Sequence, residues 1–140
     1  MPDRPEATVP PVVEAEATGR VRAIFDDIKA TKGLDAVPRF WRVLATDPAN
    51  LDRVWAQLKA VMHPEGPTQL SPLVREIIAV AVSATNGCPY CVHSHTAAAR
   101  KLGLDAAGLG EVMAVVALFN ATNALAHGYQ VEPDLPGPAA

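Results

Sequence analysis

The sequence lacks several features that mark common protein classes. No Lys or Arg occurs after Lys101, and the 140 residues carry a net charge of -3. Proteins that bind nucleic acid usually present a basic stripe to the phosphates, so the sequence argues against that class. Long apolar runs are also missing. The longest in the C-terminal part extends from Val112 to Phe119, far short of a membrane span. We therefore expect neither nucleic acid nor a membrane among the partners.

The N-terminal residues lack the basic start and apolar core of a signal peptide, so we expect a cytoplasmic protein. Cysteine is scarce too, with only Cys88 and Cys91. A disulfide between them would close a very small loop and stabilise little of the fold. In a reducing compartment, such a pair is more typical of catalysis or metal binding than of a structural role.

Strand-like alternation with hairpin turns is absent, and the chain instead carries helix start and stop signals. Starts are predicted at Thr18 or Gly19, Pro38, Asp47-Pro48, Ser71-Pro72, Cys88-Pro89 and Asp105, and stops at Gly33, Asn86-Gly87, Gly103 and Gly128. This pattern predicts an all-α protein, a bundle of about six helices. Proline-rich ends divide the chain into an extended N-terminal arm (1–17), a helical domain (18–130) and a C-terminal tail (131–140).

The last predicted helix, from Asp105 to about Gly128, is apolar on most sides. A helix of this kind must be buried, either in a core or in a subunit interface.

The Cys-x-x-Cys opens a predicted helix in which Cys88 is the N-cap and Pro89 the first helical residue. Because successive residues turn by about 100°, Cys88, Cys91 and His95 fall within roughly 60° of arc on one face. His93 falls on roughly the opposite side. The spacing therefore favours His95 over His93 as the partner of the two thiols.

This arrangement suits thiol chemistry. The unpaired N–H groups of a helix start stabilise a thiolate, and an imidazole one turn along can take the thiol proton. A second cysteine can then convert a sulfenic acid into a disulfide, which keeps the oxidation reversible. Glu76, on the preceding and mostly apolar helix, is placed to orient His95 or carry its proton if the two helices pack face to face.

Two other interpretations of the cysteine pair remain. The pair can be inert and buried, or Cys88, Cys91 and His95 can bind zinc with Glu76 or His93 as a fourth ligand. Structural zinc sites usually combine two ligand pairs from separate parts of the chain, and no second pair is evident. We expect neither a metal nor a cofactor.

A Glu, a Cys twelve positions later, then x-x-Cys and x-x-x-His resembles the active-site signature of AhpD-type alkylhydroperoxidases, members of the carboxymuconolactone decarboxylase superfamily. Glu76, Cys88, Cys91 and His95 carry this resemblance. It covers about residues 20 to 130, and the later Phe119-Asn120-x-x-Asn123 adds a weaker match.

The resemblance implies an all-helical fold and the reduction of hydroperoxides to alcohols. It makes Cys91 the cysteine that attacks the peroxide, Cys88 the resolving cysteine, His95 the base and Glu76 part of the proton relay. It also implies a dithiol reductant or lipoyl-type donor protein as partner, and a trimeric or hexameric homo-oligomer. Superfamily decarboxylases generally lack the cysteine pair, so its presence argues against decarboxylation.

The chain departs from the family pattern at Tyr90, where characterised members have a His, and this puts efficient peroxidase turnover in question. The first attacking thiol also stays open, because thioredoxin-like motifs use the cysteine nearest the helix start, here Cys88. Cys-Pro-Tyr-Cys is moreover a glutaredoxin-type sequence, although the expected βαβ context is missing. A thiol–disulfide oxidoreductase and a non-enzymatic redox-sensing oligomer therefore remain as alternatives.

Overall fold

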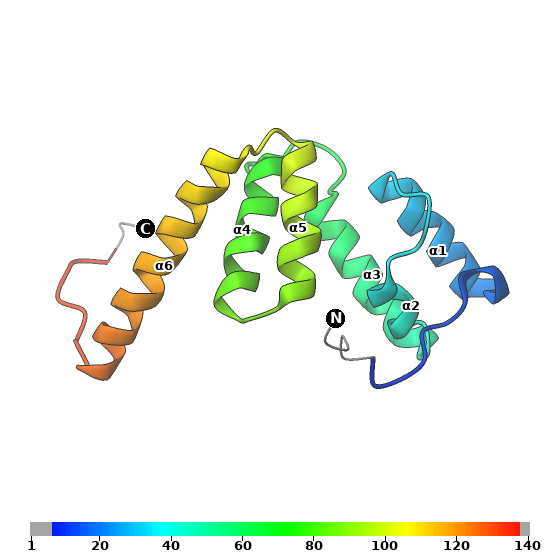
Figure 1. Cartoon of the computed structure of the whole chain (residues 1–140), viewed down its shortest axis with the longest axis horizontal. Helices are drawn as coiled ribbons and strands as arrows, with labels where there is room; N and C mark the ends of the chain where they lie inside the picture. The colour runs from blue at the N-terminus through cyan, green and yellow to red at the C-terminus, as the bar shows by residue number, and fades with distance from the viewer. Residues whose placement is uncertain (1–6, 138–140) are drawn as a thin grey trace. The chain divides into compact units, whose positions relative to one another are not determined.

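A computed structural model of the chain describes residues 7–137. This part of the chain contains six α-helices and one short 3-10 helix, and no strand (Figure 1). The predicted all-α fold is confirmed. The elements in order are η1 (Glu14–Glu16), α1 (Gly19–Lys32), α2 (Arg39–Leu44), α3 (Pro48–Met62), α4 (Pro72–Thr85), α5 (Pro89–Lys101) and α6 (Ala106–Gly128).

Four helices begin with a side chain that accepts a hydrogen bond from a backbone N–H three residues later. The caps are Asp47 for α3, Ser71 for α4, Cys88 for α5 and Asp105 for α6. In α3, α4 and α5 a proline follows the cap, where its missing N–H costs nothing. The start signals read from the sequence are therefore the ones that the backbone uses.

The chain divides into two compact units, residues 1–68 and 69–140. The first contains α1, α2 and α3, and the second contains α4, α5 and α6. The predicted helical domain, 18–130, spans both units, and its boundaries stay a prediction. The predicted arm (1–17) and tail (131–140) lie partly outside the described residues, because 1–6 and 138–140 are not described.

The apolar core of the first unit forms around two tryptophans. The rings of Trp41 and Trp55 meet edge to face with their centroids 5.2 Å apart. The buried residues of this cluster are Ala17, Ile24, Phe25, Ile28, Val37, Trp41, Ala45, Leu51 and Trp55. Most of them recur at helical spacing within α1, α2 and α3, so ordinary amphipathic packing explains this unit.

Residues 7–17 of the N-terminal arm pack on the first unit of their own chain. The Val12 N–H donates to the Arg42 carbonyl at 2.9 Å, and the Lys29 ammonium lies 2.7 Å from the Glu14 carboxylate. Glu14 also accepts the Val37 N–H at 2.9 Å. These contacts hold the pKa of Glu14 below its ordinary value, chiefly through the bond from Lys29.

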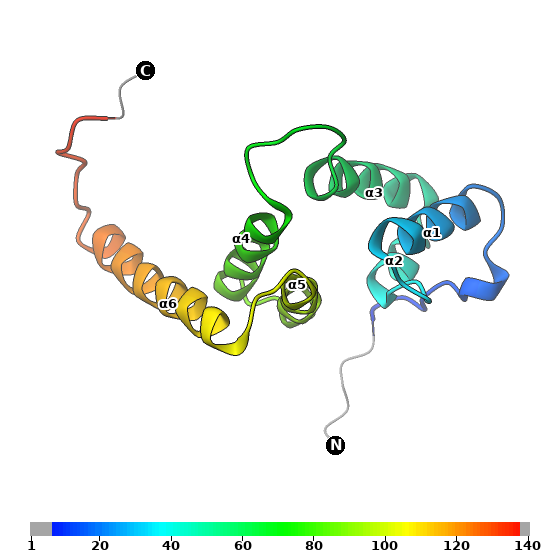
Figure 2. The ribbon, with the colours of Figure 1, turned by 90° about the horizontal axis from the view of Figure 1, so that it is seen from above.

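The second unit is built on a helical hairpin. Helices α4 and α5 lie side by side in both views and are joined by a short turn (Figures 1 and 2). The buried residues of α4 are Glu76, Val80 and Ser83, and α5 contributes Ala99. Val80 is thus the only large apolar side chain that is buried among the described residues of this unit.

Helix α6 also contacts α4, but it has no buried residue. The sequence required this helix to be buried in a core or a subunit interface. Within its own unit α6 does not enter a core, so burial in a subunit interface is the alternative that stays a prediction.

By length and composition alone, α6 would also suffice to cross a membrane. The uninterrupted apolar run used above is shorter than α6, because Asn120 and Asn123 interrupt the apolar sequence. A core or interface helix of a protein that never meets a membrane passes the same test. Length and composition therefore do not decide the surroundings of α6.

Candidate active site

A helix-ending turn at Asn86-Gly87 folds α5 back onto α4. Gly87 has a φ of 69°, in the left-handed region that residues with a side chain rarely adopt. The Gly87 N–H donates to the Ala84 carbonyl at 3.4 Å, and the Cys88 N–H donates to the Ser83 carbonyl at 3.0 Å. This pair of bonds is the Schellman motif, which closes α4 and delivers Cys88 directly to the start of α5.

Cys88 and Cys91 are bonded to each other as a disulfide. The Cys88 sulfur also accepts the Cys91 backbone N–H at 3.2 Å, so it caps the first turn of α5. The thiol pair therefore lies where a helix start stabilises negative charge on sulfur. The structure confirms that the cysteine pair can form a disulfide.

Glu76 and His95 meet between α4 and α5. The Nδ1 atom of His95 lies 2.7 Å from Oε2 of Glu76, and the side chains of His95 and Glu76 are 21% and 10% exposed. The face-to-face helix packing on which the predicted role of Glu76 depended is therefore present. Because the carboxylate engages Nδ1, Nε2 is the imidazole nitrogen left for chemistry, on the same helix and one turn after Cys91.

The other residues singled out from the sequence lie outside the Cys88–Cys91 disulfide and the Glu76–His95 contact. His93 is exposed on α5, and Tyr90, between the cysteines, is 44% exposed. The Thr85 hydroxyl donates to Oδ1 of Asn120 at 3.2 Å and so joins α4 to α6. Thr85 is nine residues after Glu76, half a turn away around α4, so this bond lies on the other side of α4 from His95.

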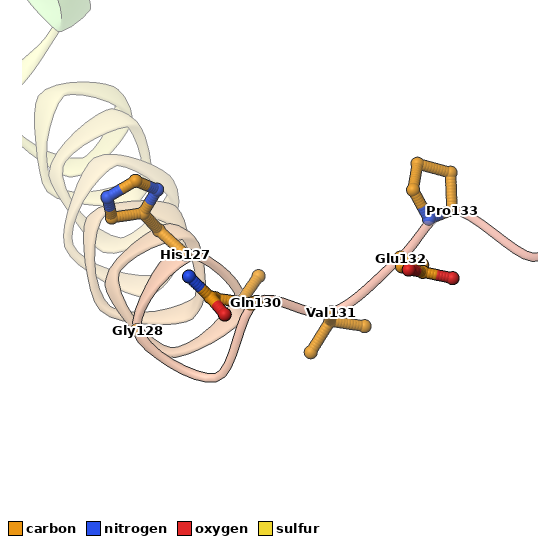
Figure 3. A pocket seen from close by; sticks show the side chains of 7 residues that line it. His127, Gly128, Gln130, Val131, Glu132 and Pro133 are labelled. Carbon is orange, nitrogen blue, oxygen red and sulfur yellow. The ribbon is translucent and has the colours of Figure 1, made fainter.

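The hollows in the described part of the second unit include the following two, and neither is lined by Glu76, Cys88, Cys91 or His95. One, of about 360 Å³, lies between the end of α4 and the middle of α6 and includes Val82, Thr85 and Phe119. The other, of about 630 Å³, lies at the end of α6 and includes His127, Gln130 and Glu132 (Figure 3). Among residues 7–137, no group of three or more His, Cys, Asp or Glu is arranged to hold a metal ion.

Ser83 also lies in this region, and its residue type and spacing predicted no role for it. Its side chain faces the same way as Glu76, because the two are seven residues apart. Ser83 is 8% exposed. In the sequence, Ser83 can be singled out because it lies five residues before Cys88, and the predicted helix stop at Gly87 lies between the two.

Comparisons with known proteins identify the family and the fold of this chain. The Carboxymuconolactone decarboxylase family model matches residues 48–131. A relative from Paracoccus denitrificans, "Uncharacterized protein 4 in cox locus", is 32% identical over 79 residues, which are 56% of this chain and 69% of the relative. The solved structure of an alkylhydroperoxidase AhpD core from Rhodospirillum rubrum ATCC 11170 has 49% sequence identity and a TM-score of 0.85.

The match to the Rhodospirillum rubrum structure covers 91% of this chain and 94% of the other. The likeness therefore extends well beyond the cysteine motif. The resemblance that Glu76, Cys88, Cys91 and His95 indicated is confirmed at the level of family and fold. This chain is a member of the carboxymuconolactone decarboxylase family with the AhpD-like helical fold.

Proposed function

We propose that this protein is a thiol-dependent peroxidase that reduces hydroperoxides through Cys88 and Cys91. The observation that carries the proposal is the Glu76–His95 contact of 2.7 Å, one helical turn from a cysteine pair that forms a disulfide. The similarity to an alkylhydroperoxidase core supports the same type of chemistry. A buried acid that orients an imidazole near a thiol is the arrangement that activates a nucleophile.

In the first proposed step, His95 takes the proton of the Cys91 thiol through Nε2, while Glu76 holds Nδ1. The Cys91 thiolate attacks the terminal oxygen of the hydroperoxide, and the O–O bond breaks. The leaving alkoxide takes a proton from the imidazolium and departs as an alcohol. Cys91 is thereby oxidised to a sulfenic acid, and the hydroperoxide is reduced by two electrons.

In the second step, the Cys88 thiolate attacks the sulfur of the Cys91 sulfenic acid. The S–O bond breaks, hydroxide leaves as water after protonation, and the disulfide forms. A dithiol donor, for which a lipoyl-type protein is our proposal, then reduces the disulfide and is itself oxidised. The sum is one hydroperoxide and one dithiol converted to one alcohol, one water and one donor disulfide.

A thiol–disulfide oxidoreductase is the second candidate. Cys88 caps the first turn of α5, and Tyr90 is exposed beside it. A pair placed at a helix start in this way suits exchange with partner disulfides, and that chemistry does not depend on one fold. A redox-sensing oligomer without turnover uses the same disulfide and is the third candidate.

Rapid-mixing oxidation of the reduced protein separates these candidates. We expect an organic hydroperoxide to oxidise it much faster than it oxidises a free thiol, with steady turnover once a dithiol is supplied. Cys91→Ser and His95→Ala should both abolish turnover while circular dichroism shows an unchanged helical signal. Loss of general acid–base catalysis alone lowers kcat/KM by about 10²–10⁴.

His93→Ala is the matched control, because His93 is an exposed imidazole on the same helix. It should retain turnover. Oxidation no faster than that of free thiol, with no turnover by any dithiol, would rule out the peroxidase. Rapid reduction of a mixed disulfide by the same preparation would then identify the oxidoreductase, and full activity in His95→Ala would remove the base from the mechanism.

A further inference from the structure

Helix α6 is longer than the helix that it packs against in its own unit. The hydroxyl of Thr85, the last residue of α4, donates to Oδ1 of Asn120 at 3.2 Å, and α6 then continues past this contact to Gly128. From Ala117 onward, every residue of α6 is exposed. The described residues therefore leave the second half of α6 uncovered.

The exposed part of α6 is apolar and carries no fixed charge. No Asp, Glu, Lys or Arg occurs in residues 112–128, and Leu118, Phe119 and Leu125 are each more than half exposed. A partner that relies on ion pairs finds no charged group to pair with here. A second copy of this chain, although its net charge is also -3, meets no like charge on this face. The 23 residues of α6, none of them buried, also match the size of a standard interface, about 20–30 residues a side.

Two asparagines interrupt this apolar face. Asn120 and Asn123 are three residues apart in α6, so their side chains lie on the same side of the helix, and both line the hollow beside the end of α4. The Asn120 oxygen accepts the Thr85 hydroxyl, which leaves its two N–H donors, and the Asn123 amide makes no hydrogen bond to any described residue. Because an amide both donates and accepts, it can pair with the same amide of a second copy.

We propose that Asn120 and Asn123 form hydrogen bonds to the same two side chains of a second copy of this chain, and so fix how two α6 helices pair. Polar side chains inside an apolar interface set register and the number of chains, because any other pairing leaves the amides without partners. Lipid would offer them no partner either. A contact between identical surfaces has a two-fold axis, which a hexamer of three such pairs contains and a ring of three copies does not. The pairing therefore favours a hexamer over a trimer.

Disulfide trapping tests the pairing directly. In a background with Cys88→Ser and Cys91→Ser, we introduce Asn120→Cys or Asn123→Cys, and we oxidise each variant and an equal mixture of the two mildly at low protein concentration. Two thiols bond only where the Cα atoms of their residues lie within about 7 Å, so a covalent dimer that a reductant cleaves is the expected product. Glu111→Cys, at an exposed position earlier in the same helix, is the matched control and should give no dimer.

Asn120→Asp gives a second, independent measure. Its carboxylate still accepts the Thr85 hydroxyl, so the contact with α4 is kept, whereas two copies now bring like charges together. The protein concentration at which half of the oligomer is dissociated should rise by about tenfold or more. Gln57→Glu, at an exposed position in α3, adds the same charge and should leave this concentration unchanged.

The absence of a covalent dimer from both asparagine positions, the mass of a trimer, or equal dissociation of Asn120→Asp and the unmodified protein would overturn the pairing. A monomer that binds phosphatidylcholine vesicles would also overturn it, because this face of α6 would then contact lipid. None of these measurements uses a peroxide or a dithiol turnover assay, so they decide the pairing separately from the proposed peroxidase activity.

Discussion

Glu76 is a charged residue that the fold nevertheless buries. A glutamate whose side chain is only 10% exposed on an apolar helix is costly unless it has a partner, and His95 is that partner at 2.7 Å. From the sequence, Glu76 alone resembles a solvated edge residue. Its pairing depends on the packing of α5 against α4, which spacing along one helix does not specify.

We expect Glu76→Gln to slow hydroperoxide turnover, but less than His95→Ala does. The amide preserves a hydrogen bond to Nδ1, and therefore the ring orientation, while it removes the negative charge that stabilises an imidazolium. A loss of about tenfold in kcat/KM is the expected size, below the usual range for loss of a complete acid–base group. Steady-state kinetics with one organic hydroperoxide and one dithiol measure it.

Glu111→Gln, which replaces an exposed carboxylate in α6 by an amide, controls for the change in net charge and should be neutral. Equal rates for Glu76→Gln and the unmodified protein would show that the carboxylate has no part in the proton relay.

The starts of α3, α4, α5 and α6 were predictable because each is encoded within four residues. Asp47, Ser71 and Asp105 accept backbone N–H groups as their residue types predict, and Cys88 does so with its sulfur. The α4–α5 turn is equally local, since Gly87 supplies the left-handed backbone conformation. Element boundaries in this chain therefore follow from short-range chemistry.

Contacts between elements were not predictable in the same way. The arm contains a 3-10 turn, Glu14–Glu16, whose Glu14 bonds Val37 and Lys29 at distant positions in the chain. The sequence predicted only an extended segment there. Pairings of this kind depend on which faces meet after the helices pack, and a periodic pattern along one helix does not contain that information.

Asp27 of α1 joins α3 through side-chain bonds and makes this packing sensitive to acid. It accepts hydrogen bonds from the Lys59 ammonium at 2.8 Å and from the Trp55 indole N–H at 2.7 Å. The hydrogen bond from Lys59, and next that from Trp55, hold the pKa of Asp27 below its ordinary 3.8. A lowered folded-state pKa adds stability above the unfolded value, and this stability is lost as the pH falls through the folded value.

We therefore expect the free energy of unfolding to fall less steeply below about pH 4 in Asp27→Asn than in the unmodified protein. The side chain is 43% exposed, so screening by solvent limits the difference to below about 1 kcal/mol. Urea unfolding followed at the tryptophans over this pH range measures it. Asp35→Asn, at an exposed carboxylate after α1, should keep the original pH dependence. If the free energy of unfolding depended on pH in the same way in all three proteins, the role assigned to Asp27 would be contradicted.

The two units of the chain differ sharply in what they bury. The first has a tryptophan-centred core, whereas the second buries Val80 as its only large apolar side chain among the described residues. Exposed apolar side chains instead cover α4 and α6. They include Val74, Ile78, Val82, Val115, Leu118, Phe119 and Leu125. So much apolar surface on one helical unit is the composition of an interface.

Association through α6 therefore follows as a prediction about the assembly, and we expect a trimer or hexamer of this chain. Light scattering after size-exclusion chromatography should give the mass of the oligomer. Leu118→Lys should dissociate it, because a lysine ammonium in an apolar interface loses its hydration without a partner. Leu135→Lys, in the exposed tail, introduces the same charge and should leave the mass unchanged.

Folding and association should then be linked, because the second unit has little core of its own. If only the folded chain associates, its unfolding temperature rises with protein concentration. Thermal unfolding at two concentrations about tenfold apart should show this rise, and Leu118→Lys should abolish it. A monomer whose unfolding temperature does not change with protein concentration would contradict the prediction. If that monomer also bound to lipid vesicles, the length and composition of α6 would instead indicate a helix that contacts a membrane.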